Sequence, residues 1–290
     1  TQGKHKVLPI CWEFTDFILP NLDCLIRKIR IKNMSSNPIR IKLWQYTNFY
    51  IDERIRYNTT EYLKDIDTIF HYRANTTIGI CSSLKTSAFQ CGNNAKEQIL
   101  YLSLECDRQE MTSDGALMWE LGYLNGHDYI ENVIYLVADT SIDTVTQSID
   151  YVKNHSIDEL EMKTFKYWNN IYQRSRDLPL SDEKLKTLYL RSIMVFHLLS
   201  HVDLGGILAA PEVDEDFQYC GGYGFCWGRD AAYITNAIDI AGYPDLVEKF
   251  YKWAAVAQNA DGSWSQRHYL DGTLAPNWGL QIDETGSILW

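Results

Sequence analysis

The first 140 residues contain short runs in which apolar and polar positions alternate, the pattern of strands with one buried face. The alternation is strict in residues 29–32 and 39–43, and segment 33–38 between them is rich in Asn, Ser and Pro, which favour a turn. This pattern predicts a β-hairpin with one face exposed to solvent.

Other runs in the same region predict further strands. Residues 66–72 alternate, as do Leu100, Leu102 and Leu104, whereas residues 133–137 form a continuous apolar run. A continuous run is expected of a strand buried on both faces. Many short strands separated by turn signals predict an antiparallel β-sandwich over residues 1–140.

The spacing of apolar residues becomes helical from about residue 141 and predicts a helical linker to about residue 180, punctuated by Pro179. A helix capped by Ser181 should follow and be buried on most of its surface, since its apolar residues recur over several turns. Three more helices are predicted, starting near the residues Arg229, Asp245 and Asp283. Gly242 suits the end of the first of these.

Composition narrows the range of partners. Hydrophobic residues make up 46% and charged residues 22% of the 290, as in an ordinary globular protein. The net charge of −11 argues against nucleic-acid and anionic-membrane partners, and no apolar run is long enough to span a bilayer.

Seven scattered cysteines without a CxxC motif predict neither a disulfide framework nor a zinc site, and favour reduced thiols in the cytoplasm. Secretion stays open because four glycosylation triplets start at Asn33, Asn58, Asn75 and Asn154.

The segment from Trp227 to Asp230 combines residue types that bind sugars. An arginine can donate to hydroxyls in a fork, an aspartate can accept from a pair of hydroxyls, and a tryptophan can cover the apolar face of a sugar ring. Trp227, Arg229 and Asp230 therefore form a candidate sugar site at the start of a helix. The alternative is that Asp230 is only a first-turn acid paired with Arg229.

Two later segments offer similar chemistry. Residues 261–272 lie between two Asp-Gly pairs, so they form either a plain ordered loop or a sugar-pocket wall built from Trp264 and Arg267. Within them, His268 is expected to be a packed loop histidine. In residues 278–286 the adjacent acids Asp283 and Glu284 cannot point the same way, so they would have different roles, or would simply start a helix.

A resemblance to the glucoamylase-type enzymes of glycoside hydrolase family 15 rests on three segments in this order: GYGFCWGRDAAY, DGSWSQRHYLDG and APNWGLQIDETGS. The segment DGALMWELG at residues 114–122 fits a late strand of the sandwich that precedes the barrel in such enzymes. The resemblance implies a multidomain β + α protein, with an N-terminal antiparallel β-sandwich followed by the first helices of an incomplete (α/α) six-hairpin barrel over residues 181–290.

The same resemblance implies an O-glycosyl hydrolase that releases glucose from the non-reducing ends of α-glucans with inversion, like a glucan 1,4-α-glucosidase. Its substrate would be an oligosaccharide or polysaccharide, and it would need no cofactor and no metal. Trp227, Arg229 and Asp230 would bind the terminal glucose, and Trp278, Gln281 and Glu284 would contribute to substrate binding along the same funnel.

The general acid and base of such enzymes lie in later motifs, so they are expected beyond Trp290 and this piece alone is expected to be inactive. Trehalase and dextran-type glucohydrolases share the scaffold and stay open as alternatives. A non-catalytic carbohydrate-binding protein is a second alternative. A third, a phosphorylase, would need a phosphate site, and none stands out in the sequence.

Overall fold

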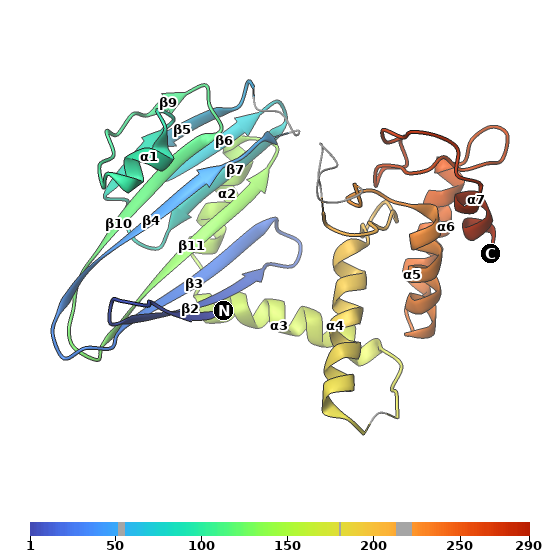
Figure 1. The fold of residues 1–290 in the computed structure, drawn as a ribbon, viewed down its shortest axis with the longest axis horizontal. Helices are drawn as coiled ribbons and strands as arrows, with labels where there is room; N and C mark the ends of the chain where they lie inside the picture. Colours follow the sequence, from blue (N-terminus) through green and yellow to red (C-terminus); the bar gives the residue numbers. More distant parts are fainter. Residues whose placement is uncertain (52–55, 180, 213–221) are drawn as a thin grey trace. The chain divides into compact units, whose positions relative to one another are not determined.

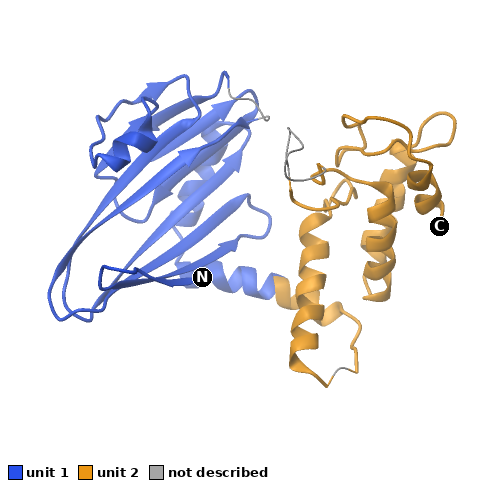
Figure 2. Ribbon diagram, viewed as in Figure 1, with its two compact units in different colours: residues 1–167 blue, residues 168–290 orange. Residues whose placement is uncertain are grey.

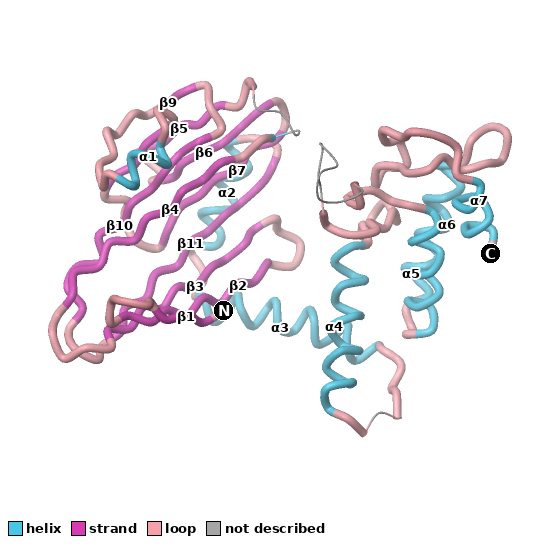
Figure 3. Tube along the Cα trace, in the orientation of Figure 1, coloured by secondary structure: helices cyan, strands magenta, loops and turns pink. Residues whose placement is uncertain are grey.

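The computed structural model describes residues 1–51, 56–179, 181–212 and 222–290. The chain divides into two compact units, Thr1–Tyr167 and Trp168–Trp290 (Figure 2), which are taken one at a time below. Strands dominate the first unit and helices the second (Figure 3).

The strands of the first unit form two sheets in which all pairs are antiparallel (Figure 1). The larger sheet has the order β1-β2-β3-β11-β7-β6-β5-β9 and the smaller has the order β4-β10-β8. The strands are β1 (Gln2–Lys4), β2 (Ile10–Ile18), β3 (Cys24–Asn33), β4 (Ile39–Asn48), β5 (Thr59–Leu63), β6 (Thr68–Arg73), β7 (Thr76–Ser82), β8 (Ala88–Cys91), β9 (Gln109–Glu110), β10 (Asp114–Leu124) and β11 (Tyr129–Asp139).

Three layers bury the strands at the centre of the larger sheet on both faces. In β11, Ile134 packs into the core between the two sheets, while Tyr135 and Val137 pack on the other face against α2 (Ile142–Lys153) and α3 (Ile157–Arg174). Figure 1 shows α2 lying along this face of the sheet. The apolar run at residues 133–137 therefore is the buried strand that the sequence predicts.

The predicted hairpin between residues 29–32 and 39–43 is wrong, although both strands exist. β3 pairs with β2 and β11 in the larger sheet, whereas β4 pairs with β10 in the smaller one, so the connection crosses between sheets. The fully buried Asn33 fixes this crossing, because its Nδ2 donates to the carbonyls of Asn37 (2.7 Å), Leu124 (3.1 Å) and Asn125 (3.1 Å). An asparagine from a segment of turn-like composition thus links the two sheets through its side chain.

The predicted strand through Leu100, Leu102 and Leu104 is also wrong. Residues up to Leu100 belong to α1 (Ala95–Leu100), and Leu102 has a positive φ of 55°. Leu100 and Leu102 are 75% and 71% exposed, so they have no buried face that would favour a strand.

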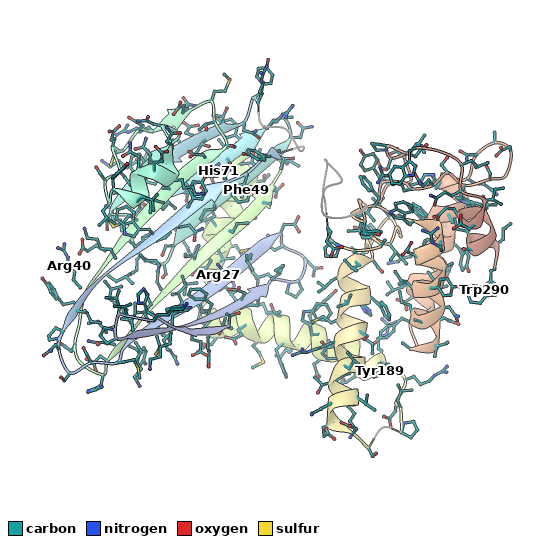
Figure 4. The ribbon with its side chains drawn as sticks, viewed as in Figure 1. Arg27, Arg40, Phe49, His71, Tyr189 and Trp290 are labelled. Atoms are coloured by element: carbon teal, nitrogen blue, oxygen red, sulfur yellow. The ribbon has the colours of Figure 1, made fainter. Side chains whose placement is uncertain are left out.

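A buried histidine lies between the sheets of the first unit. His71 on β6 is fully buried, and its ring nitrogens lie 2.8 Å from Thr47 Oγ1 and 3.0 Å from Thr60 Oγ1. Its ring contacts Phe49 at a centroid distance of 5.1 Å, and Figure 4 labels this pair. Burial is the main reason that the pKa of His71 is lowered to about 4.

The second unit contains the end of α3 and the helices α4 (Glu183–Leu199), α5 (Gly228–Ile240), α6 (Pro244–Ala257) and α7 (Ile282–Leu289). The positions of the last three match the predicted helices, and Gly242 has the positive φ (100°) expected just after α5. Phe250 and Trp253 of α6 are among the buried residues of its core.

Two predictions for α4 are corrected. Its cap is Asp182, whose side chain accepts from the Lys184 amide, and not Ser181. The helix is largely exposed, because among the described residues its neighbours bury only Ile193 fully while Leu188 and Leu198 stay 61% and 58% exposed. Among the described residues, none of the helices is both long and apolar enough to cross a membrane.

Candidate functional site

The candidate sugar-binding residues come together where α5 and α7 begin. Trp227 is the N-terminal flanking residue of α5 and Gln281 is that of α7. The backbone amide of Arg229 in α5 donates to Glu284 Oε2 of α7 at 2.7 Å. This bond links the first turns of two helices that are 55 residues apart in the sequence.

Charged side chains gather at this junction around Arg229. Its guanidinium is ion-paired with Asp283, and it lies 3.1 Å from Glu284 Oε1 and 3.8 Å from Asp230. The contact with Glu284 Oε1 is an ion pair without the alignment of a hydrogen bond. One arginine thus holds three carboxylates around it.

The acids differ in burial, as expected for adjacent residues on a helix. Glu284 is fully buried, whereas the side chains of Asp283 and Asp230 are 55% and 39% exposed. Burial raises the pKa of Glu284, and the amide and charge of Arg229 oppose that rise. Burial also acts to lower the pKa of Arg229, but the hydrogen bond that its guanidinium donates to Asp283 and the negative charges nearby outweigh it and raise this pKa.

An aromatic cluster lies beside the charges. The Trp227 and Trp278 rings meet edge to face with centroids 6.1 Å apart, and the Arg229 guanidinium lies 5.8 Å from the Trp227 centroid. Trp227 is buried (5% exposed), while Trp278 is 60% exposed and presents its ring to solvent. The exposed ring is therefore the one that could stack on a ligand.

The loop at residues 261–272 supports this cluster from behind. Two backbone hydrogen bonds join Cys226 and His268, at 2.9 and 3.0 Å, so that the residues beside them, Trp227 and Arg267, are held close together. His268 is buried, as expected of a packed loop histidine. Trp264 is core instead of pocket wall, because it is 5% exposed and its Nε1 donates to the Ala254 carbonyl at 2.8 Å.

Arg267 is buried (2% exposed) and its guanidinium lies over three aromatic rings: Phe225 (4.6 Å), Trp278 (4.7 Å) and Trp227 (5.7 Å). Phe225 and the fully buried Gln266, whose Oε1 accepts from the Trp278 amide at 3.3 Å, were not predicted as site residues. Both residues lie inside segments that carry the family resemblance, and this position is the only signal that could have pointed to them.

Gln281 contributes its backbone, since its carbonyl accepts from the Glu284 amide at 3.2 Å.

No group of three or more His, Cys, Asp or Glu side chains is placed to hold a metal ion in the described part of the chain. The six described cysteines are free thiols, and Cys220 lies outside the described residues. Of the four glycosylation triplets, those at Asn33 and Asn58 have fully buried asparagines.

Known proteins resemble this chain over most of its length. No family model matches the sequence. An uncharacterized glycosyl hydrolase of Methanocaldococcus jannaschii is 28% identical over 288 residues, covering 95% of this chain and 45% of that protein. A glucoamylase of Clostridium sp. is 27% identical over 150 residues, covering 50% of this chain and 20% of that protein. The chain thus spans less than half the length of the curated relatives it matches.

Solved structures resemble the fold. A bacterial glucoamylase complexed with acarbose matches with a TM-score of 0.79 and 16% identity, over 93% of this chain and 41% of that one. A putative kojibiose phosphorylase from the human microbiome matches with a TM-score of 0.67 and 14% identity, over 97% of this chain and 38% of that one. The comparisons confirm the predicted fold class and the resemblance to glycoside hydrolases of the six-hairpin, glucoamylase-like type.

Proposed function

From this fold and this pair of clusters, we propose that the chain binds the terminal glucose unit of an α-glucan in an enzyme that releases glucose from non-reducing ends with inversion. The observation that carries the proposal is the placement of Arg229, Asp230 and Trp278. A part-exposed cation, a part-exposed carboxylate and an exposed aromatic ring meet at one junction of two helices.

Each of these groups suits one feature of a sugar. The Arg229 guanidinium is anchored on its buried side by Glu284, so its remaining N–H groups can donate to ring hydroxyls. The Asp230 carboxylate can accept from a pair of hydroxyls, and the exposed Trp278 ring can cover the apolar face of a sugar. Trp227 and Gln281 would contribute to the same site as support for Trp278 and for the start of α7.

We assign no catalytic role to the acids of this cluster. An inverting glycosidase needs a general acid and a general base whose carboxyls are roughly 6.5–9.5 Å apart on opposite sides of the bond to be cleaved. Asp230, Asp283 and Glu284 all gather around one guanidinium, which suits binding better than a pair of opposed catalysts. From the resemblance, we expect other motifs of the enzyme to supply the catalytic pair.

The test is a binding titration of this chain with glucose, maltose and trehalose, followed by tryptophan fluorescence. Asp230→Ala should abolish a saturable change that the unchanged protein gives. Asp245→Ala is the matched control, since Asp245 is also a first-turn acid paired with an arginine, Arg174. No saturable binding by the unchanged chain, or equal binding by both variants, would reject the proposal.

The similarity to a putative kojibiose phosphorylase, which covers 97% of this chain, favours a second candidate, a phosphorylase of α-linked glucosides. The whole enzyme would separate the two by its product. Hydrolysis releases β-glucose whether or not phosphate is present, whereas phosphorolysis requires phosphate and yields a glucose phosphate. Trehalase and dextran-type activities would appear as a preference for trehalose or for α-1,6-linked oligosaccharides over maltotriose.

A further inference from the structure

We propose that Arg267 is a positioning residue that holds the Trp227 and Trp278 rings in the arrangement that receives the sugar. The inference rests on the proposed sugar site and assigns a role to a residue behind it. Arg267 itself is buried, with 2% of its surface exposed, and so does not reach a ligand in solution.

The contacts of Arg267 tie together two separate loops. Its Nη1 donates to the Gly222 carbonyl at 3.3 Å, in the segment that leads to Trp227, and its Nε donates to the Pro276 carbonyl, in the segment that leads to Trp278. Between these bonds the planar guanidinium stacks near three aromatic rings. One side chain therefore sets the separation of the two loops that carry the tryptophans.

A guanidinium suits this place better than other side chains of similar size. It is planar and delocalised, so it stacks on rings while its edge donates hydrogen bonds in fixed directions. A lysine ammonium is a compact charge that cannot donate to both carbonyls and lie flat against rings at once. Burial lowers the pKa of Arg267, and these contacts offset the cost of burying its charge.

The consequence is greatest for Trp278. Its ring is 60% exposed, and a ring so exposed would normally sample several rotamers and lose that freedom on binding. The guanidinium, 4.7 Å from the ring centroid, and the bond from the Trp278 amide to Gln266 Oε1 hold the ring and its backbone from the protein side. Holding the ring before binding lowers the entropy cost of binding and so raises affinity.

The test combines a ligand-free measurement with a ligand titration on the whole chain labelled with 5-fluorotryptophan. The Trp227 and Trp278 resonances are assigned from single Trp→Phe variants and compared in Arg267→Met, Arg267→Lys and the unchanged protein. Arg174→Met is the matched control, because Arg174 also lies over an aromatic ring, that of Tyr243 at 5.3 Å, in the same unit.

The expected result is that both Arg267 variants shift or broaden the Trp227 and Trp278 resonances without ligand and weaken maltose binding by about tenfold. Arg267→Lys should not rescue binding although it keeps the charge, and Arg174→Met should leave both readouts unchanged. If the unchanged protein binds no maltose, the proposed function fails, and the ligand-free resonances still decide whether Arg267 positions the rings.

Three results would overturn the inference. The first is a folded Arg267→Met protein whose two tryptophan resonances match those of the unchanged protein. The second is a maltose affinity that stays within about twofold of the original in a folded Arg267 variant. The third is complete unfolding of both variants, which would make Arg267 a support of the whole unit and not of the two rings.

Discussion

Replacement of Glu284 by glutamine should separate the stability of the site from its affinity for sugar. The Glu284 carboxylate is fully buried and accepts from the Arg229 amide at 2.7 Å. Glutamine keeps the shape and this acceptor and removes a charge whose burial is costly, so we expect the free energy of unfolding at neutral pH to change by less than about 1 kcal/mol. Glu284→Ala also leaves a cavity and an unpaired amide and should cost about 3 kcal/mol.

The affinity for sugar should respond differently. In Glu284→Gln, the anchoring charge 3.1 Å from the Arg229 guanidinium is gone. The amide N–H groups of glutamine are donors, as are those of the guanidinium, so the two side chains no longer attract each other in the same way. Loss of one charge-assisted contact is worth about 1.5 kcal/mol, which corresponds to roughly tenfold weaker maltose binding. Urea unfolding and a maltose titration of the same samples measure the two effects.

The pH dependence of stability gives an independent check. Burial raises the pKa of Glu284, so the folded protein binds this proton more readily than the unfolded chain does. The contribution of Glu284 to stability is thus full below its unfolded pKa and is lost as pH rises through its folded pKa. The stability advantage of the unchanged protein over Glu284→Gln should therefore shrink from pH 4 to pH 7. An advantage that grows with pH, or an unchanged maltose affinity, would refute the reasoning.

Four further variants test other parts of the fold by urea unfolding. Because burial lowers the pKa of His71 to about 4, the folded protein takes up a proton at this ring less readily than the unfolded chain, whose pKa is near 6.5. The free energy of unfolding should therefore fall by about 2 kcal/mol between pH 7.5 and pH 5, and His71→Gln should lack this part of the fall. Gly205→Ala should cost more than about 2 kcal/mol, since φ is +86° and the new Cβ would lie 2.3 Å from a backbone oxygen, whereas Gly286→Ala, with nothing within 4 Å in a helix, should gain about 0.5 kcal/mol. Asn33→Ala should cost about 2 kcal/mol because it leaves buried carbonyls without their donor, and an unchanged midpoint would refute its role at the crossing.

The sequence predicts where the strands and helices of this protein lie better than it predicts which elements pack or pair with one another. Alternation in residues 29–32 and 39–43 correctly indicates two strands, because the pattern depends only on which face each residue buries. The alternation does not indicate which other strand pairs with each of these two. Asn33 is a residue type that favours turns, yet its side chain is buried between the two sheets. Its burial depends on hydrogen bonds to residues about 90 positions away in the sequence.

The same limit applies to α4 and to Leu100. An apolar pattern predicts a buried helix, but burial depends on what packs against it, and among the described residues little covers Leu188 and Leu198. Spacing alone likewise cannot separate a strand from the end of a short helix at Leu100. Local chemistry, such as Gly242 at the end of α5, is predicted well because it needs no distant partner.

For the candidate site, the residues within the motifs could be named from the sequence, and the contacts that hold them could be inferred only in part. Trp227, Arg229 and Asp230 stand in a motif whose chemistry can be inferred from residue type. That Glu284 is a buried anchor and Arg267 a buried stack follows only from the tertiary structure, since both residue types usually lie on the surface.

Glu284 and Arg267, the two buried charged residues of the site, are placed in the same way, each behind a more exposed group. Glu284 lies behind the cation Arg229, and Arg267 lies behind the aromatic ring of Trp278, while the Trp227 ring lies within 6 Å of both guanidiniums. Arg229 and Trp278 are thus each held by a buried partner of complementary charge or polarity. Since a buried partner holds its neighbour more firmly than a solvated one, this arrangement fixes the site before a ligand arrives. It follows that changing either buried charge should weaken binding without touching a ligand contact.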